Sequence, residues 1–278
     1  MKKQEKLIIT AAVTGSRNTR DQTPYIPITP EEISQSCIDC WKAGAAIVHV
    51  HVRDLKTKFG TQDIDLFKRT LDPIREKTDL VVCFTTSGIA GQNLPFEKRL
   101  EPLDLGPELA SLDAGSINLA GNVFSNPPEF LDLAASVMRK KNVKPEIEIF
   151  DLGMLITALN MRAAGKLDDP IYCQFVLGTP HGAPATAKSL LHLYEHLPSN
   201  SIWSVTGIGK GHLPVSMIGL VLGGHIRVGM EDNLYYRRGE LAKTNAMFVE
   251  RIVRIASEYG RDVACPNEAR NILGLKKG

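Results

Sequence analysis

The sequence predicts an α/β protein with the (β/α)8 fold, a TIM barrel, formed by residues 1–278 as a single domain. Short apolar runs rich in β-branched residues alternate along the chain with segments of helical periodicity. Eight such runs follow one another, and no linker rich in proline, glycine or serine separates them. The length of 278 residues also suits a barrel, which often reaches about 250 residues as one unit. A doubly wound open sheet is the alternative architecture.

Most of the predicted strands are continuous apolar runs, which is typical of parallel strands covered on both faces. They lie at residues 7–12, 46–52, 80–85, 109–113, 144–150, 171–177, 202–205 and 225–228. Helices are predicted at residues 29–43, 64–76, 128–141, 152–164, 186–196, 213–222 and 240–257. The connection between the third and fourth strands is irregular, with a short helix at 96–100 at most. In the first helix, Thr29 can act as N-cap, with Pro30 at the first position and Glu32 completing a capping box.

Composition excludes several classes of protein. Lysine and arginine number 33 and acidic residues 31, without long blocks of either sign, so neither nucleic acid nor an anionic membrane is expected as a partner. No apolar run approaches the roughly 20 residues of a membrane span, and we expect a cytoplasmic protein. Five scattered cysteines do not resemble a disulfide framework. Cys37 and Cys40 have redox or zinc spacing, but they fall within the first predicted helix, where packing is the favoured role.

His49 and His51 are the most informative pair of residues. They lie two apart in a predicted strand, so both imidazoles point to the same face. Two neutral imidazoles side by side begin a transition-metal site, usually for zinc, although packed or hydrogen-bonded histidines remain an alternative. The strand emerges into a loop at Arg53, and this C-terminal end is where α/β folds bind ligands.

The end of the eighth strand can complete a metal site. Alternate strands of a barrel fill the same interior layers, so the second and eighth strands, which are separated only by the first, should contribute side chains to the same layers. Glu231 would then be the third ligand and leave one coordination position open, the alternative being a solvated acidic turn. Arg227 can pair with Asp232 in the same segment and keep that carboxylate ionised, or the pair can be structural.

Other polar residues follow neighbouring strands. Thr85 follows the third strand, and Ser111 and Asp113 lie on the fourth, where they can orient a substrate carboxylate or carbonyl. Turns use the same residue types. Glu146 and Glu148 share a face of the fifth strand, and a buried carboxylate there needs a partner. Glu148 is nearer the exit and is the better candidate for supporting the site or transferring a proton.

A glycine-rich turn follows the seventh strand. Gly207, Gly209 and Lys210 resemble the phosphate-binding turns that barrels carry at this place, which predicts a binding site for a cofactor's phosphates. The signal is weak when taken alone.

Several motifs resemble those of the β-keto acid cleavage enzyme family, nearly from end to end. They are ITAAVTG at 9–15, ITPEE at 28–32, HVHVR at 49–53, QFVLG at 174–178, GIG at 207–209 and GGHIRVGMEDN at 223–233. The resemblance implies a barrel, usually a homotetramer, that converts a β-keto acid and acetyl-CoA into acetoacetate and a new acyl-CoA. It also implies a divalent metal, with Zn²⁺ expected, on His49, His51 and Glu231. Arg227 and Asp232 match the family's catalytic arginine and aspartate.

The resemblance also assigns the substrate contacts. Thr85 stands where a serine is found, Ser111 where a threonine is found, and Asp113 where an asparagine is expected. Glu148 matches the family's glutamate on the fifth strand. Arg17 stands where members that act on an amino substrate have a glutamate that binds the ammonium group.

The charge of Arg17 therefore argues against an amino substrate. A dianionic β-keto acid such as 3-oxoadipate or 3-oxoglutarate is expected instead, because a guanidinium pairs well with a second carboxylate. A solvent-facing Arg17 with a neutral acyl substrate is the alternative. The implied chemistry is a retro-Claisen cleavage in which Asp232, held by Arg227, acts as the base. A metal-dependent aldolase or lyase barrel that uses a keto acid without CoA is the competing function.

Overall fold

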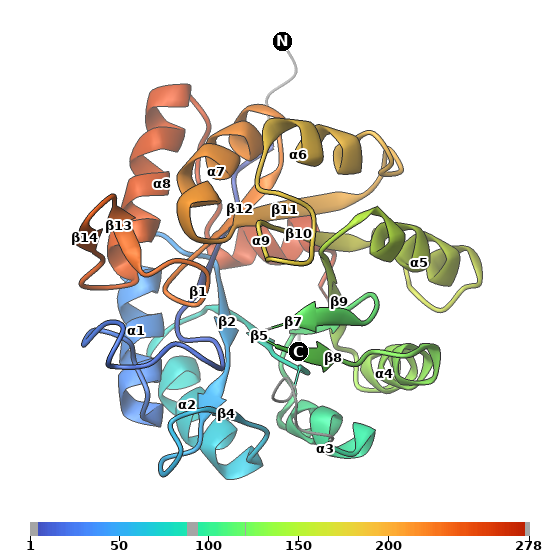
Figure 1. Cartoon of the computed structure of the whole chain (residues 1–278), viewed down its shortest axis with the longest axis horizontal. Coiled ribbons are helices and arrows are strands. Elements are labelled where there is room, and N and C mark those ends of the chain that lie inside the picture. The colour runs from blue at the N-terminus through green and yellow to red at the C-terminus, as the bar shows by residue number, and fades with distance from the viewer. Residues whose placement is uncertain (1–4, 88–93, 120, 276–278) are drawn as a thin grey trace.

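A computed structural model describes residues 5–87, 94–119 and 121–275 of the chain. All eight predicted strands are present, and they close into one parallel barrel (Figure 1), which confirms the predicted fold class. In order around the barrel they are β1 (Ile9–Ala12), β2 (Ile47–Val50), β5 (Val81–Phe84), β6 (Leu109–Asp113), β9 (Lys144–Ile149), β10 (Tyr172–Leu177), β11 (Ile202–Gly207) and β12 (His225–Val228). Because β1 separates β2 from β12, the second and eighth strands lie one strand apart, as the layer argument requires.

Helices surround the barrel (Figure 1). They are α1 (Pro30–Lys42), α2 (Ile64–Lys77), α3 (Phe96–Leu100), α4 (Pro128–Lys140), α5 (Leu152–Ala163), α6 (Ala187–Tyr194), α7 (His212–Val221), α8 (Ala246–Tyr259) and α9 (Pro266–Leu273). Two 3-10 helices add to them, η1 (Glu101–Leu105) and η2 (Gly209–Gly211). None of the helices in the described ranges is both long enough and apolar enough to cross a membrane.

The prediction that the last long helix begins at residue 240 is wrong. Residues Glu240–Leu241 form strand β14, which pairs with β13 (Tyr235–Arg237). The chain reverses at Gly239, whose φ of 77° is a left-handed conformation that favours glycine. Helix α8 starts only after Asn245, because that side chain binds the backbone N–H of Met230 and the carbonyl of Val13. The predicted helix was therefore too long at its N-terminal end, because its first residues form part of a hairpin.

Two further hairpins follow barrel strands and were not predicted. Strand β3 (Val52–Arg53) pairs with β4 (Gly60–Thr61), and β7 (Ile117–Leu119) pairs with β8 (Asn122–Phe124). They come after β2 and β6, so they extend the C-terminal end of the barrel, where the polar residues of the chain gather. Helix α9 was also missed.

The capping box of α1 forms as predicted. The Thr29 hydroxyl accepts from the N–H of Glu32 at 3.2 Å, and the Glu32 carboxylate accepts from the N–H of Thr29 at 3.0 Å. The same carboxylate binds the guanidinium of Arg20 at 2.5 Å, in the loop between β1 and α1. Glu32 therefore fixes one part of a loop that borders the site described next.

Candidate active site

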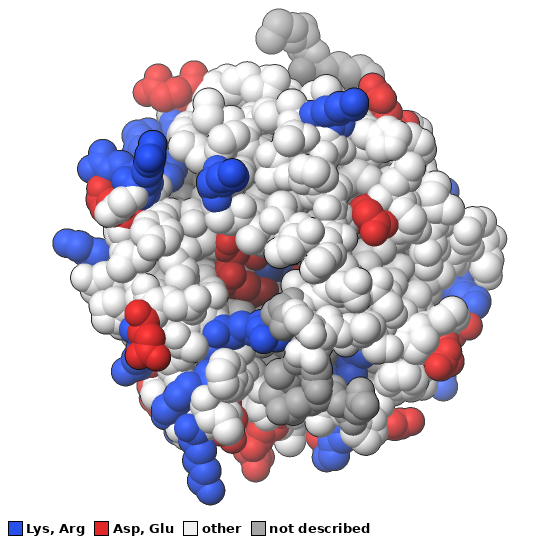
Figure 2. Space-filling view, viewed as in Figure 1, with Lys and Arg blue, Asp and Glu red and all other residues white. Residues whose placement is uncertain are grey.

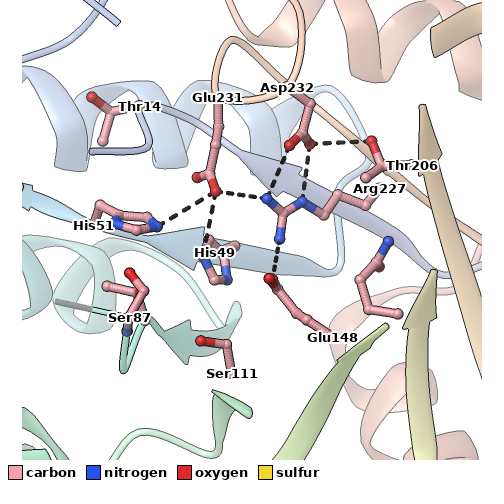
Figure 3. Close-up of polar contacts among 12 residues, drawn as sticks. Thr14, His49, His51, Ser87, Ser111, Glu148, Thr206, Arg227, Glu231 and Asp232 are labelled. Carbon is pink, nitrogen blue, oxygen red and sulfur yellow. Dashed lines mark hydrogen bonds and ion pairs between the residues drawn. The ribbon is translucent and has the colours of Figure 1, made fainter. Parts of the chain in front are cut away.

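Two imidazoles and one carboxylate meet at the C-terminal end of the barrel (Figure 3). His49 lies in β2 and His51 just after it, with ring centroids 5.1 Å apart. Glu231 comes from the loop after β12, and its Oε1 atom lies 3.7 Å from Nε2 of His49 and 3.4 Å from Nε2 of His51. Figure 2 shows the same face, with acidic side chains at the bottom of a hollow near its centre.

These three residues fit a zinc ion. Ligand atoms about 2.0–2.1 Å from a tetrahedral zinc lie roughly 3.3–3.4 Å from one another, close to the two separations found here. The second carboxylate oxygen of Glu231 is buried and has no hydrogen-bond partner among the described residues. An anionic oxygen left in this way is expected where a cation binds, because burying it unpaired is costly.

Arg227 organises the acidic side of the site. Its Nε and Nη2 atoms donate to the two oxygens of Asp232, at 2.9 and 3.0 Å. Nη1 donates to Glu148 at 2.8 Å, and Nη2 also donates to Glu231 at 2.6 Å. Thr206, at the end of β11, donates to Asp232 at 3.2 Å. When ionised, the three carboxylates carry −3 and the guanidinium +1, so the remaining −2 equals the charge that a divalent cation would cancel.

Burial and charge separate the roles of the two adjacent acids. Burial alone would raise the pKa of Glu231, but Arg227 and the two imidazoles hold this pKa well below its usual range. Burial raises the pKa of Asp232; Arg227 partly opposes the shift and Glu231 adds to it. Burial also lowers the pKa of His49 well below its usual value. An ionised Glu231 and a neutral His49 suit metal ligands, and a more basic Asp232 suits proton abstraction.

The predicted substrate hydroxyls lie on or directly after β5 and β6, the next two strands around the barrel from the strand of His49. Thr85, after β5, is buried and its hydroxyl shares a hydrogen bond of 2.8 Å with Ser87. Ser111, on β6, accepts from the N–H of Thr86 at 3.2 Å, and its carbonyl accepts from the Thr86 hydroxyl at 2.8 Å. Both contacts use Ser111 as an acceptor, so its hydroxyl proton has no acceptor within the described ranges, and Thr86, which sequence reasoning missed, holds Ser111 in place.

Asp113, where the family resemblance leads one to expect asparagine, has an unusual environment. It is buried, and its Oδ2 atom has no hydrogen-bond partner within the described part of the chain. Burial and the neighbouring Glu148 raise its pKa well above the usual value, with Arg99 opposing in part. A protonated aspartic acid offers one donor and one acceptor, as asparagine does through its amide. The raised pKa therefore favours the form of Asp113 whose hydrogen-bonding pattern matches that of asparagine.

The loop that carries Arg17 is fixed beside Glu231. Asn18 donates from its side-chain amide to the carbonyl of Glu231 at 3.2 Å, and the Ser16 carbonyl accepts from the N–H of Gly60 at 2.8 Å. Arg17 itself is exposed, and it makes no ion pair with any residue in the ranges 5–87, 94–119 and 121–275. Within the described part of the structure, Arg17 therefore carries an unpaired charge in a loop that is fixed to Glu231.

The buried side chain of Arg53 holds the loop that carries Arg17, a role that the sequence did not reveal. Its guanidinium donates to the carbonyl of Thr14 at 2.6 Å and to that of Asn18 at 3.1 Å. Because the partners are backbone carbonyls more than 30 positions away, no side-chain pattern could have identified them.

The glycine-rich turn lies beside Asp232. Gly207 ends β11, and a Cβ atom there would lie 2.4 Å from the Gly211 carbonyl, so the turn needs glycine. The N–H of Gly209 donates to the Asp232 carbonyl at 3.0 Å and is not available to a phosphate. The turn thus positions the loop of Asp232, and Lys210, which is exposed, is left as its candidate phosphate contact.

Comparison with known proteins identifies the family. The β-keto acid cleavage enzyme family matches residues 6–275. A relative named 3-keto-5-aminohexanoate cleavage enzyme, from Fusobacterium nucleatum, is 41% identical over 98% of this chain and 99% of its own. Another, from Cupriavidus necator and named 3-oxoadipate:acetyl-CoA acetyltransferase, is 36% identical over 96% of this chain and 94% of its own.

A solved structure supports the fold. The ternary complex of ObcA with a C4-CoA adduct and oxalate aligns with a TM-score of 0.80 over 91% of this chain and 68% of that chain. At 21% identity this likeness bears on the barrel alone. The family match covers the strands that carry His49, Glu148 and Arg227 together with the loops that carry Glu231 and Asp232. The chain is therefore an enzyme, and it belongs to the β-keto acid cleavage enzyme family.

Proposed function

We propose that this enzyme cleaves a dianionic β-keto acid with acetyl-CoA as co-substrate, giving acetoacetate and a new acyl-CoA, with a divalent metal, zinc, on His49, His51 and Glu231. Relatives whose names specify acetyl-CoA as acceptor support the co-substrate. The choice of substrate depends on one observation: Arg17 has no ion-pair partner in the described ranges and lies in the loop fixed to Glu231.

The two ends of the substrate meet different chemistry. The keto acid end faces hydroxyls and the metal ligands, with Ser111 and Asp113 on β6 as hydrogen-bonding partners of its carboxylate or ketone. The far end reaches the loop of Arg17, whose guanidinium can bind a second carboxylate through two parallel hydrogen bonds. An ammonium group at that end would be repelled. The relative at 41% identity is named for an amino substrate, but this residue favours a dicarboxylate such as 3-oxoadipate or 3-oxoglutarate.

The reaction starts with a proton transfer to Asp232. Arg227 and Thr206 hold its oxygens so that Asp232 removes a proton from C2, the carbon between the ketone and the carboxylate. The C2 carbanion attacks the thioester carbonyl of acetyl-CoA, the C–S bond breaks and the CoA thiolate leaves. A divalent ion, when bound, would supply Lewis acidity that polarises the ketone.

The second half of the reaction breaks the carbon–carbon bond. The CoA thiolate attacks the original ketone carbon, and the bond between this carbon and C2 breaks. Asp232 returns its proton to C2, which gives acetoacetate, while the other fragment leaves as an acyl-CoA. Glu148 keeps Arg227 in one orientation throughout, through the hydrogen bond of 2.8 Å to Nη1. Lys210 is the proposed contact for the phosphates of CoA.

Substrate preference tests this proposal. We would measure kcat/KM for 3-oxoadipate, 3-oxohexanoate and 5-amino-3-oxohexanoate in the wild type and in Arg17→Gln. The wild type should prefer the dianion, and the variant should lose about 10–100-fold for the dianion alone, as expected for a charge-assisted hydrogen-bonded pair. Arg20→Gln is the matched control, since Arg20 is an exposed arginine of the same loop that already pairs with Glu32.

Two outcomes would contradict the proposal. A wild type that prefers the amino substrate, or an Arg17→Gln variant with an unchanged ranking, would show that Arg17 does not contact the substrate. Omitting acetyl-CoA separates the competing function, because a metal-dependent aldolase or lyase would consume the keto acid without it. Dialysis against a chelator should abolish turnover, and added zinc should restore it.

A further inference from the structure

A carboxyl group without a partner lies inside the barrel, below the site. Glu146, on β9, is completely buried, and neither of its carboxyl oxygens has a hydrogen-bond partner among the residues that the structure describes. An unpartnered polar group in such a place destabilises the folded protein, and an ionised one destabilises it more. A functional constraint would explain why the chain retains it.

A second unsatisfied group nearby belongs to one of the proposed metal ligands. Oε1 of Glu146 lies 3.8 Å from Nδ1 of His49, and this nitrogen is also buried and unpartnered within the described ranges. The other ring nitrogen, Nε2, faces Glu231 at 3.7 Å. The imidazole of His49 therefore lies between two carboxyl groups, one on each side of the ring. Shortening the Nδ1–Oε1 distance by about 1 Å would give an ordinary hydrogen bond.

We propose that Glu146 is the positioning residue of His49: its oxygen accepts the Nδ1–H and so directs the Nε2 lone pair to the metal. The inference rests on the proposed metal site. A hydrogen bond at one nitrogen fixes the tautomer and the orientation of a ligating histidine, and such partners commonly contribute 10–100-fold to metal affinity. The argument holds for either protonation state of Glu146, because the carbonyl oxygen of a carboxylic acid also accepts.

A different use of the same atoms must be distinguished. Nδ1 of His49, the thiol of Cys83 and the carboxyl of Glu146 lie within 4.8 Å of one another and could form a second cation site. All three residues are at most 1% exposed, so the barrel encloses this group without an evident path for an ion. A second site would give two metal ions per chain and depend on Cys83, whereas our proposal gives one and is independent of the thiol.

Replacing Glu146 by leucine should affect stability and zinc affinity in opposite directions. Glu146→Leu removes a buried unpartnered polar group, so the metal-free protein should be as stable as the wild type or more stable. Its zinc dissociation constant should nevertheless rise about 10–100-fold. Glu146→Gln keeps a carbonyl acceptor and should stay within about threefold of the wild type. A merely structural role would change stability and leave affinity alone.

The test measures the zinc affinity of the metal-free protein by competition with a chromophoric chelator. Mass spectrometry of the loaded protein gives the number of zinc ions per chain. Cys83→Ala is the control and should bind one zinc with wild-type affinity. An unchanged affinity in Glu146→Leu, or two zinc ions per wild-type chain with one in Cys83→Ala, would overturn the inference. A wild type that binds no zinc would refute the metal site itself, and this proposal with it.

A measurement on the wild type covers the case in which Glu146→Leu does not fold. In the zinc-loaded protein, nitrogen NMR of the histidine rings should show His49 with its proton on Nδ1. Finding the proton on Nε2 would contradict the proposed hydrogen bond directly.

Discussion

Replacing Arg227 by methionine should destabilise the metal-free enzyme in a way that depends strongly on pH. The side chain is only 3% exposed and donates four hydrogen bonds to three carboxylates. Methionine has a similar length but offers no charge, so these carboxylates would remain buried without their cation. Removing one partner of a buried ion pair costs about 3–5 kcal/mol. For a chain of this size we expect the melting temperature to fall by about 6–15 °C.

The sign of the pH effect follows from the carboxylates. In the wild type the pKa of Glu231 is held well below its usual range, so its stabilisation is present above that range and is lost as pH falls. In Arg227→Met the carboxylate pKa values should lie above their unfolded values, so stability is lost as pH rises. Both effects increase the difference in the free energy of unfolding between the wild type and Arg227→Met as pH rises. The variant should be close to the wild type near pH 5 and far less stable near pH 8.

Urea unfolding followed by circular dichroism, with a chelator present at both pH values, measures this difference in the free energy of unfolding. Arg227→Lys serves as the control, because it keeps the charge but lacks the planar group that binds Asp232 and Glu148 together. It should be intermediate in stability. A difference of equal size at both pH values, or a methionine variant as stable as the wild type at pH 8, would refute the electrostatic reasoning.

Three further substitutions test separate parts of the site. His51→Ala should weaken zinc binding by more than about 100-fold in calorimetric titration, because two remaining ligands hold a divalent ion poorly; stoichiometric, tight binding would contradict the triad. Asp232→Asn should keep its metal but lower kcat by about 10²–10⁴-fold, as the loss of a general base does; a near-normal rate would move the base to another residue. Since burial raises the pKa of Asp232, wild-type kcat should fall as pH drops through that value. Asp113→Asn should keep kcat/KM within about threefold at pH 7, because an amide reproduces the protonated acid; a large loss would mean that this group works as a carboxylate.

The barrel could be predicted because its strands are apolar runs that need no knowledge of distant contacts. Strands β6 and β12 have the predicted bounds, and the others differ from prediction by a few residues at their ends. The clustering of His49, His51 and Glu231 could be predicted for a related reason. A spacing of two places His49 and His51 on one face, and barrel closure brings the eighth strand near the second.

The residues that support the site were harder to foresee. In the sequence Arg53 follows a predicted strand and Arg99 falls in a predicted short helix, with nothing to indicate burial, yet both are buried and bind backbone carbonyls of distant loops. Backbone acceptors leave no trace in residue type, so only the folded chain reveals such contacts. The hairpin of β13 and β14 was missed because its turn depends on the conformation of Gly239. The later start of α8 was missed because it coincides with contacts of Asn245 to the distant residues Val13 and Met230.

The attachment of the Arg17 loop to Glu231 bears on how such an enzyme can change its substrate during evolution. A Cβ atom on Gly15 would lie 2.7 Å from Cγ of Glu231, and Asn18 binds the Glu231 carbonyl, so the loop backbone cannot move without disturbing the metal ligand. The Arg17 side chain carries no such constraint in the described structure. Under the proposed function, one substitution at position 17 would therefore reverse the charge presented to the substrate tail while His49, His51 and Glu231 keep their places. The proposed tail contact, Arg17, and the proposed metal ligand, Glu231, are joined through the loop backbone but are separate side chains. Divergence toward anionic, neutral or cationic keto acids would then require few compensating mutations.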